Sequence, residues 1–115
     1  MRIIVAADGG PEGKAAAHFA HCSHFVVFEV EGNEVKNTEA VENPYLGRHV
    51  PAAIPEFVKS LGADILITGG IGPRAIELLG KMDIEVLYGA EGKPEGLVAG
   101  YLEGKTKQSK NPCNH

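Results

Sequence analysis

The sequence lacks tryptophan, and aromatic residues make up only 6% of its 115 residues. A core built from this chain must therefore be mostly aliphatic. The sequence also lacks an excess of basic charge, since its formal net charge is −4 and its lysines and arginines are scattered. Because phosphate binding usually leaves a basic footprint, this composition argues against a nucleic-acid partner.

Long apolar runs are lacking too, since no stretch approaches the roughly 18 residues that a membrane-spanning helix needs. The first residues lead directly into an apolar strand pattern, without the hydrophobic region and cleavage site of a secretory signal. We therefore expect a cytoplasmic protein with no membrane partner. Cysteine is scarce: Cys22 and Cys113 are expected to be free thiols or ligands, because a reducing compartment disfavours a structural disulfide.

What the sequence does contain is a succession of strand and helix patterns. Apolar runs predict strands over 2–7, 24–31, 64–68 and 84–88. Gly32-Asn33 predicts a tight hairpin turn into a further strand over 34–38. Apolar periodicity and prolines near helix starts predict helices over 50–61, 73–82 and 94–102, after a loop over 42–49.

The alternation of strands and helices in the second half of the chain implies parallel βαβ connections. The hairpin of the first half adds antiparallel strands to the same sheet. We therefore expect a single α/β domain with a mixed central sheet and helices on its faces, spanning residues 1–105. Residues 106–115 are expected to form a flexible tail.

The densest group of chemically active residues is His18-Phe19-Ala20-His21-Cys22-Ser23-His24. Imidazole and thiolate suit iron, copper and zinc, so His18, His21, Cys22 and His24 are candidate ligands of a soft metal. The spacing is not that of a closed zinc site, which normally has four ligands in two pairs. The alternative is a solvated loop in which Cys22 is a small core residue.

Two other segments could extend this group. His49 lies in the loop before the second half of the chain and is a candidate metal ligand only jointly with the first group. Its alternative role is structural, at the start of a helix. Cys113 and His115 at the carboxyl end could form a mobile ligand arm or have no role.

A glycine-rich turn, Gly69 to Arg74, joins a predicted buried strand to a helix. Such turns often bind anions because backbone amides at the helix start point outward, which makes Gly70, Gly72 and Arg74 candidate binding residues. The turn lacks the Gly-x-Gly-x-x-Gly pattern and the Walker lysine, and a tight turn alone would also explain its glycines. Asp8 is the one acid at a strand end and is better explained as a turn cap, so we do not expect an enzyme.

The whole chain resembles the dinitrogenase iron-molybdenum cofactor biosynthesis family, which includes NifX-like proteins and nitrogenase accessory factors. The most specific segment is Thr68-Gly69-Gly70-Ile71-Gly72-Pro73-Arg74-Ala75. Other matching segments are Ile3-Ile4-Val5-Ala6, His18-Phe19, Phe25 to Val30, Glu42-Asn43-Pro44, Gly47 to Pro51, Ala63-Asp64, Leu78-Leu79 and Ile84-Glu85-Val86. The chain departs from the family pattern at His21 and His24, which stand where the family has arginine and tyrosine.

The resemblance implies a three-layer domain of ribonuclease H-like architecture. It also implies a binding or carrier protein for an iron-sulfur or iron-molybdenum-type cluster, or its precursor, in metallocluster assembly or delivery. On this hypothesis His18, Cys22 and His49 hold the cluster, His21 and His24 support them, and the partners are donor and acceptor proteins. The alternative is a regulatory module that binds a small anionic ligand at the Gly69–Arg74 turn.

Overall fold

The structure is a computed structural model that describes residues 1–9, 12–48, 50 and 52–104. The tail predicted over 106–115 therefore lies outside the described residues. The six strands are β1 (Arg2–Asp8), β2 (Lys14–Ala15), β3 (His24–Glu31), β4 (Glu34–Glu42), β5 (Ile65–Ile67) and β6 (Glu85–Leu87). The helices are the short 3-10 helix η2 (Phe19–His21), α1 (Ala53–Ser60), α2 (Pro73–Lys81) and α3 (Pro94–Leu102).

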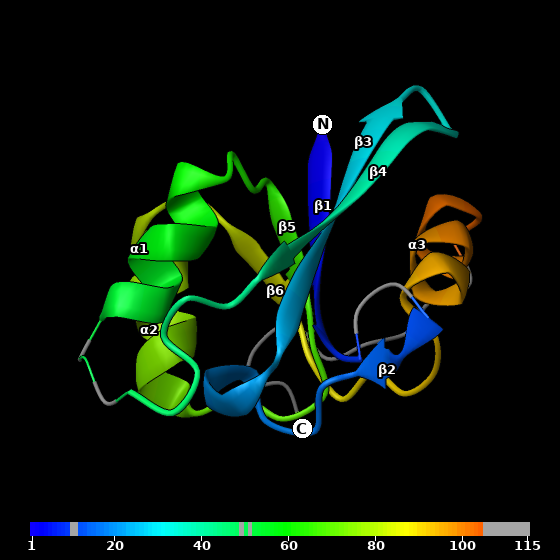
Figure 1. The fold of residues 1–115 in the computed structure, drawn as a ribbon. Coiled ribbons are helices and arrows are strands. Elements are labelled where there is room, and N and C mark those ends of the chain that lie inside the picture. The colour runs from blue at the N-terminus through cyan, green and yellow to red at the C-terminus, as the bar shows by residue number, and fades with distance from the viewer. Residues whose placement is uncertain (10–11, 49, 51, 105–115) are drawn as a thin grey trace.

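The strands form one mixed sheet in the order β4-β3-β1-β5-β6, with β2 pairing with β1. β1, β5 and β6 run parallel, whereas β3 is antiparallel to both β1 and β4. Figure 1 shows α1 and α2 together on one face of the sheet and α3 on the other. This arrangement confirms the predicted single α/β domain with a mixed central sheet. No helix in the described part of the chain is long and apolar enough to cross a membrane.

β1 lies at the centre of the sheet because its apolar side chains can be buried on both faces. Ile4 and Ala6 belong to the core under α1 and α2. Ile3 and Val5, on the alternate positions, belong to the core that α3 covers. The two-residue period of a strand therefore divides one continuous apolar run between two hydrophobic cores.

The largest differences from the sequence prediction concern β4, β2 and α1, while other strand and helix ends shift by at most one residue. β4 continues to Glu42, beyond the predicted end at residue 38, because residues 39–42 pair with β3 as an exposed edge strand and need no apolar alternation. The two-residue strand β2 was not predicted; it forms only by pairing with the end of β1. α1 begins at Ala53 rather than at residue 50, because Ala52 has a left-handed φ of 65° that interrupts a helix.

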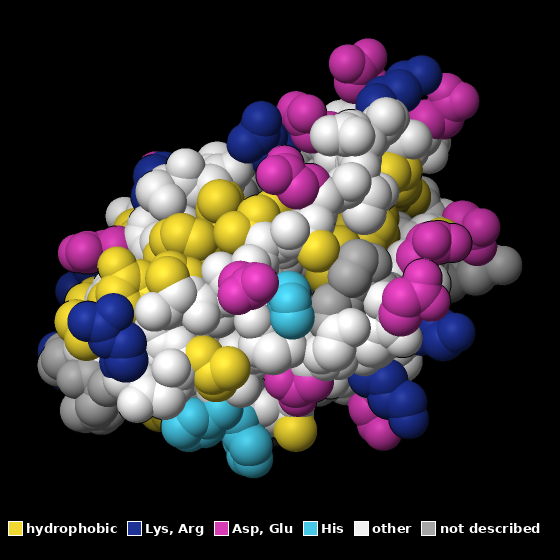
Figure 2. Space-filling model, in the orientation of Figure 1, with side chains coloured by type: hydrophobic (Ala, Val, Ile, Leu, Met, Phe, Trp, Pro, Cys, Tyr) yellow, Lys and Arg dark blue, Asp and Glu magenta, His cyan; other side chains and the backbone are white. Residues whose placement is uncertain are grey.

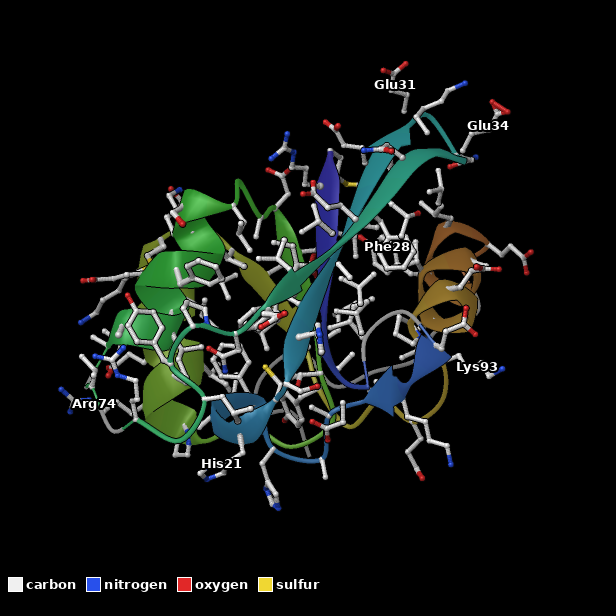
Figure 3. The ribbon with its side chains drawn as sticks, viewed as in Figure 1. His21, Phe28, Glu31, Glu34, Arg74 and Lys93 are labelled. Carbon is white, nitrogen blue, oxygen red and sulfur yellow. The ribbon has the colours of Figure 1, made fainter. Side chains whose placement is uncertain are left out.

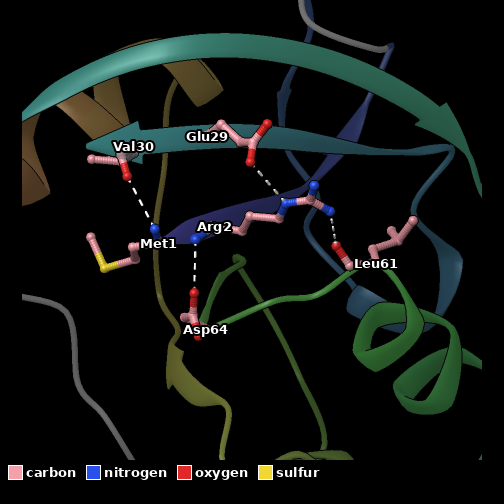
Figure 4. A network of polar contacts seen from close by, with 6 residues as sticks. All are labelled: Met1, Arg2, Glu29, Val30, Leu61 and Asp64. Carbon is pink, nitrogen blue, oxygen red and sulfur yellow. Dashed lines mark hydrogen bonds and ion pairs between the residues drawn. The ribbon is translucent and has the colours of Figure 1, made fainter.

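The amino-terminal edge of the sheet is held by polar contacts around Arg2 (Figure 4). The Arg2 backbone amide donates to Asp64 Oδ2 at 2.8 Å, and its guanidinium donates to the Leu61 carbonyl at 2.8 Å and to Glu29 Oε1 at 3.3 Å. The amino-terminal ammonium of Met1 donates to the Val30 carbonyl at 3.1 Å. These contacts join β1, β3 and the α1–β5 connection, so the polar groups of this edge are engaged in structural bonds.

Candidate functional site

The opposite edge of the sheet collects the segments in which the sequence places its candidate ligands. β5 ends there and leads through Gly69 to Gly72 into α2, while η2 precedes the start of β3 at the same edge. α1 also begins at this edge, because it runs antiparallel to the strand that follows it (Figure 1). Ligands in α/β proteins usually bind at the carboxyl ends of parallel strands, which makes this edge the candidate site.

Two loops are joined along this edge by a run of backbone hydrogen bonds. The amides of Gly69 and Gly70 donate to the carbonyls of Ala16 and Ala17 at 2.9 and 2.8 Å, and the Phe19 amide donates to the Gly70 carbonyl at 2.8 Å. A Cβ at Gly70 would lie 2.2 Å from the Ala17 carbonyl oxygen, and one at Gly69 2.4 Å from that of Ala16. The two glycines are thus required for close approach of the loops, and their amides are already used.

The segment that contains η2 alternates between buried and exposed side chains. Phe19 is 3% exposed and packs edge to face against Phe25, with ring centroids 6.1 Å apart. Cys22, three residues from each of them, is fully buried in the same core. His18 and His21, on the alternate face, are exposed. The segment therefore presents its imidazoles outward and its thiol inward.

Cys22 is buried, whereas His18 and His21 are exposed. The Asn43 side-chain amide donates to the Cys22 carbonyl at 2.9 Å and approaches its Sγ at 3.8 Å. Burial, together with the negative charge of Asp8, raises the pKa of the Cys22 thiol to about 12. In this conformation Cys22 packs as a core residue, as in the alternative that the sequence left open.

The other predicted ligands are only partly brought together. The rings of His18 and His21 lie with centroids 6.3 Å apart and planes at 84°. His24 is half-buried on β3, and its Nδ1 is hydrogen-bonded to Ser23 Oγ at 2.8 Å. His49 lies outside the described residues, as do Cys113 and His115. Among the described residues, no three side chains of His, Cys, Asp or Glu form a group that could hold a metal ion.

Two pockets flank η2 and share Phe19, Ala20 and His21 as a common wall. The smaller has a volume of about 360 Å³ and is otherwise lined by His18 and by Gly70 to Gly72. The larger has a volume of about 700 Å³ and lies between η2 and the starts of α1 and α2. We call it the arginine pocket. Its apolar side chains come from Phe19, Val50, Ile54, Pro55, Ala75 and Leu78, and its polar ones are His21, Arg48 and Arg74.

The polar side chains of the arginine pocket are all capable of carrying positive charge. Within the described residues, neither Arg48 nor Arg74 forms an ion pair. Figure 3 shows Arg74 and His21 at the same end of the molecule, from two elements far apart in the sequence. In Figure 2, histidine side chains protrude along this lower edge of the surface, below an apolar area over α1. The site can therefore attract an anion beside an apolar surface.

The structure adds two residues that the sequence reasoning did not select. Arg48 lines the arginine pocket together with Arg74, and the Asn43 side chain links the loop that carries Arg48 to the Cys22 carbonyl. The Asn43 side chain also accepts the Tyr45 amide at 2.9 Å, which forms the turn that follows β4. Their position in the sequence could have indicated them, because both residues follow β4, which ends at the carboxyl edge of the sheet.

The fold and this edge define a small α/β protein with a ligand-sized, positively lined pocket. Residues 1–104 match the family model described as dinitrogenase iron-molybdenum cofactor, and the chain belongs to this family. The match confirms the resemblance seen in the sequence.

Solved structures and a curated relative are similar to this chain over nearly its whole length. The crystal structure of PH0822 has 32% sequence identity and a TM-score of 0.86, and the match covers 100% of both chains. The apo form of the orange protein from Desulfovibrio gigas has 28% identity and a TM-score of 0.83, over 96% of this chain and 94% of that one. MJ0580, an uncharacterized protein of Methanocaldococcus jannaschii, is 27% identical over 110 residues, which cover 94% of this chain and 91% of the relative.

Proposed function

We propose that this protein binds an anionic metallocluster of iron-sulfur or iron-molybdenum type, or its precursor, in the arginine pocket. It would carry the cluster between a donor and an acceptor protein and would not itself be an enzyme. Family membership supports a metallocluster-related role. The observation that carries the finer proposal is the pair of guanidinium groups, Arg48 and Arg74, on an apolar pocket of about 700 Å³.

The chemistry of this lining favours an anion. A guanidinium presents several N–H donors in one plane and stays charged at any physiological pH, and the His21 imidazole can add a further donor. Apolar walls lower the local dielectric constant, so an anion seated against them interacts more strongly with the arginines than it would in water. A volume of about 700 Å³ lies within the usual range of small-molecule and cofactor sites.

The buried position of Cys22 favours a cluster that is held by charge and hydrogen bonding over one that is ligated by a thiolate. Its thiol is buried and its pKa is raised to about 12, so it is protonated at neutral pH. A cluster held by Arg48 and Arg74 keeps its metal atoms free of protein thiolates. Its transfer to an acceptor then requires no metal–sulfur bond to the carrier to break, which suits delivery.

The proposal is tested by anaerobic reconstitution of the full chain with ferrous iron and sulfide, followed by visible absorption and metal and sulfide analysis. The decisive variant is Arg48→Ala/Arg74→Ala. Its matched control is Lys36→Ala/Lys93→Ala, which also removes two positive charges. Lys36 lies on β4 and Lys93 precedes α3, and Figure 3 shows Lys93 on the side of the molecule opposite Arg74.

We expect a stoichiometric chromophore in the wild type and in the lysine variant, and at least a fivefold lower yield in the arginine variant. Raising the ionic strength from about 0.05 M to 0.5 M should weaken retention, because it shortens the Debye length severalfold. A wild type without a chromophore contradicts cluster binding. A chromophore that is equally strong in the arginine variant contradicts retention in the arginine pocket.

The alternative function, a module for a small anionic ligand, depends on Arg74 rather than on the amides of Gly69 and Gly70. Gly69 and Gly70 donate their amides within the protein, whereas Arg74 lines an apolar pocket with Arg48. This arrangement favours a ligand with an anionic group and an apolar body. Titration with a series of aromatic and aliphatic carboxylates, followed by NMR, tests it: metal-free binding that is lost in the arginine variant would favour this function.

A further inference from the structure

We propose that His18 and His21 form a two-imidazole site for a single divalent transition-metal ion such as Zn²⁺. This site shares His21 with the wall of the arginine pocket, but it uses neither arginine and needs no cluster. It goes beyond the proposed carrier function, because it concerns a metal ion bound directly by protein nitrogen atoms on the outer face of η2.

The backbone places the two imidazoles on one side of the turn. His18 is the residue before η2, and His21 is its last residue. The backbone between them makes a single tight turn, closed by a hydrogen bond from the His21 amide to the His18 carbonyl at 3.0 Å, so the two residues lie close together. The two ring centroids are accordingly 6.3 Å apart. A metal ion about 2.0–2.1 Å from one nitrogen of each ring would hold the centroids roughly 5–6.5 Å apart, so only side-chain rotation is required.

The turn that carries the two histidines is fixed by contacts with the rest of the protein. The His21 amide donates to the His18 carbonyl at 3.0 Å, and the amide of Phe19 donates to Gly70 at 2.8 Å. The Phe19 ring is buried in the core, where it packs against Phe25. Both ligands therefore stand on a rigid support, and metal binding would not have to order a loop, a cost that otherwise weakens affinity.

The neighbouring candidates do not fit the same ion. Cys22 is fully buried while His18 and His21 are exposed, and the Nδ1 atom of His24 is engaged by Ser23 Oγ at 2.8 Å. With two protein ligands, the ion keeps further positions for water or an exogenous ligand. The pocket of about 360 Å³ beside His18 and His21 provides the space for them. Imidazole ligands with open positions suit zinc, copper and nickel, and they predict a readily exchangeable ion.

The experiment is a titration of the full metal-free chain with zinc chloride at pH 7.5. Calorimetry gives the affinity, and ¹H–¹⁵N spectra of the histidine rings identify the ligands. We expect the ring nitrogens of His18 and His21 to shift together in one saturable step, while those of His24 do not. His18→Ala and His21→Gln should each lower the zinc affinity at least tenfold, and His24→Gln should change it less than twofold.

Two further variants separate this site from other binding sites. Arg48→Ala/Arg74→Ala should leave zinc affinity within twofold, so that failure of the cluster proposal and failure of this one are distinguishable. Cys113→Ser/His115→Gln, in the tail outside the described residues, should also leave it within twofold. Zinc affinity that persists in a His18→Ala/His21→Ala variant, or that is lost with the tail variant, overturns the proposal. Backbone amide spectra of each variant verify that the fold is retained.

Discussion

The contact between Gly70 and Ala17 leads to a specific prediction for stability. In Gly70→Ala, the added Cβ would lie 2.2 Å from the Ala17 carbonyl oxygen, well inside the 3.0 Å that real Cβ atoms keep. The clash is with backbone, so no side chain can swing away to relieve it. Relief requires the two loops to separate by about 1 Å, which conflicts with the close packing of the interior.

The expected magnitude follows from the bonds that this separation breaks. Three backbone hydrogen bonds join the loops, from Gly69, Gly70 and Phe19. Each contributes about 0.5–1.5 kcal/mol net, so Gly70→Ala should lower the free energy of unfolding by about 2–4 kcal/mol. The matched control is Gly80→Ala in α2, where a Cβ meets nothing within 4 Å. That variant should raise stability by about 0.5–1 kcal/mol, since alanine favours a helix.

Urea unfolding of the two variants and the wild type, followed by circular dichroism, measures both effects. A Gly70→Ala variant as stable as the wild type would refute the structural reasoning, because the loops would then have room for a side chain. If that stable variant also lost cluster or anion binding, Gly70 would have the direct ligand role that the sequence suggested. A loss of stability of the predicted size would show that Gly70 is needed for the close approach of its loop to the loop that carries Ala17.

Three further predictions concern single side chains. Because burial raises the pKa of the Cys22 thiol to about 12, the folded state holds a proton that the unfolded chain loses from about pH 9. Stability should therefore fall between pH 9 and 12 by up to about 1.4 kcal/mol per pH unit, and alkaline urea titrations should show a shallower loss in Cys22→Ala. Ala52→Gly should raise the free energy of unfolding by about 0.5–1 kcal/mol, because Ala52 has a left-handed φ of 65° that glycine adopts without strain. Urea unfolding curves without a gain in stability would contradict this prediction. Thr68→Val should be neutral or stabilising by up to about 1 kcal/mol in the same assay, since the fully buried hydroxyl has no partner among the described residues; a loss above 1 kcal/mol would reveal a bonded hydroxyl.

The fold could be predicted where local sequence decides the structure. The apolar run of β1, the Gly32-Asn33 turn and the prolines that open α2 and α3 each determine their element through steric preference or periodicity. β2 and the end of β4 could not be predicted in this way. Both are polar or short, and both exist because a neighbouring strand offers hydrogen-bonding partners that only the folded chain brings near.

The candidate site was predictable in position but not in composition. The glycine-rich turn located the carboxyl edge of the sheet, and Arg74 lies on a pocket there. Arg48 could not be selected, because its approach to Arg74's pocket depends on how the segment after β4 folds back toward α1. The same holds for the roles of Gly69 and Gly70, whose amides bond to a loop more than 50 residues earlier in the sequence.

The segment from His18 to Phe25 shows why residue type alone gave an incomplete set of ligands. Phe19, Cys22 and Phe25 recur every third residue and are buried, while the histidines at 18, 21 and 24 occupy the alternate positions. The two phenylalanines determine which side of the segment is buried, because their large rings gain the most from burial in the core. Cys22, which lies between them in the sequence, is buried on the same side. The Cys22 thiol is therefore buried in the core, while the imidazoles of His18 and His21 remain exposed at the surface. Arg48 and Arg74 are exposed as well. Among the described residues this edge therefore presents no accessible thiol, which fits the proposed retention of a cluster by charge and hydrogen bonding.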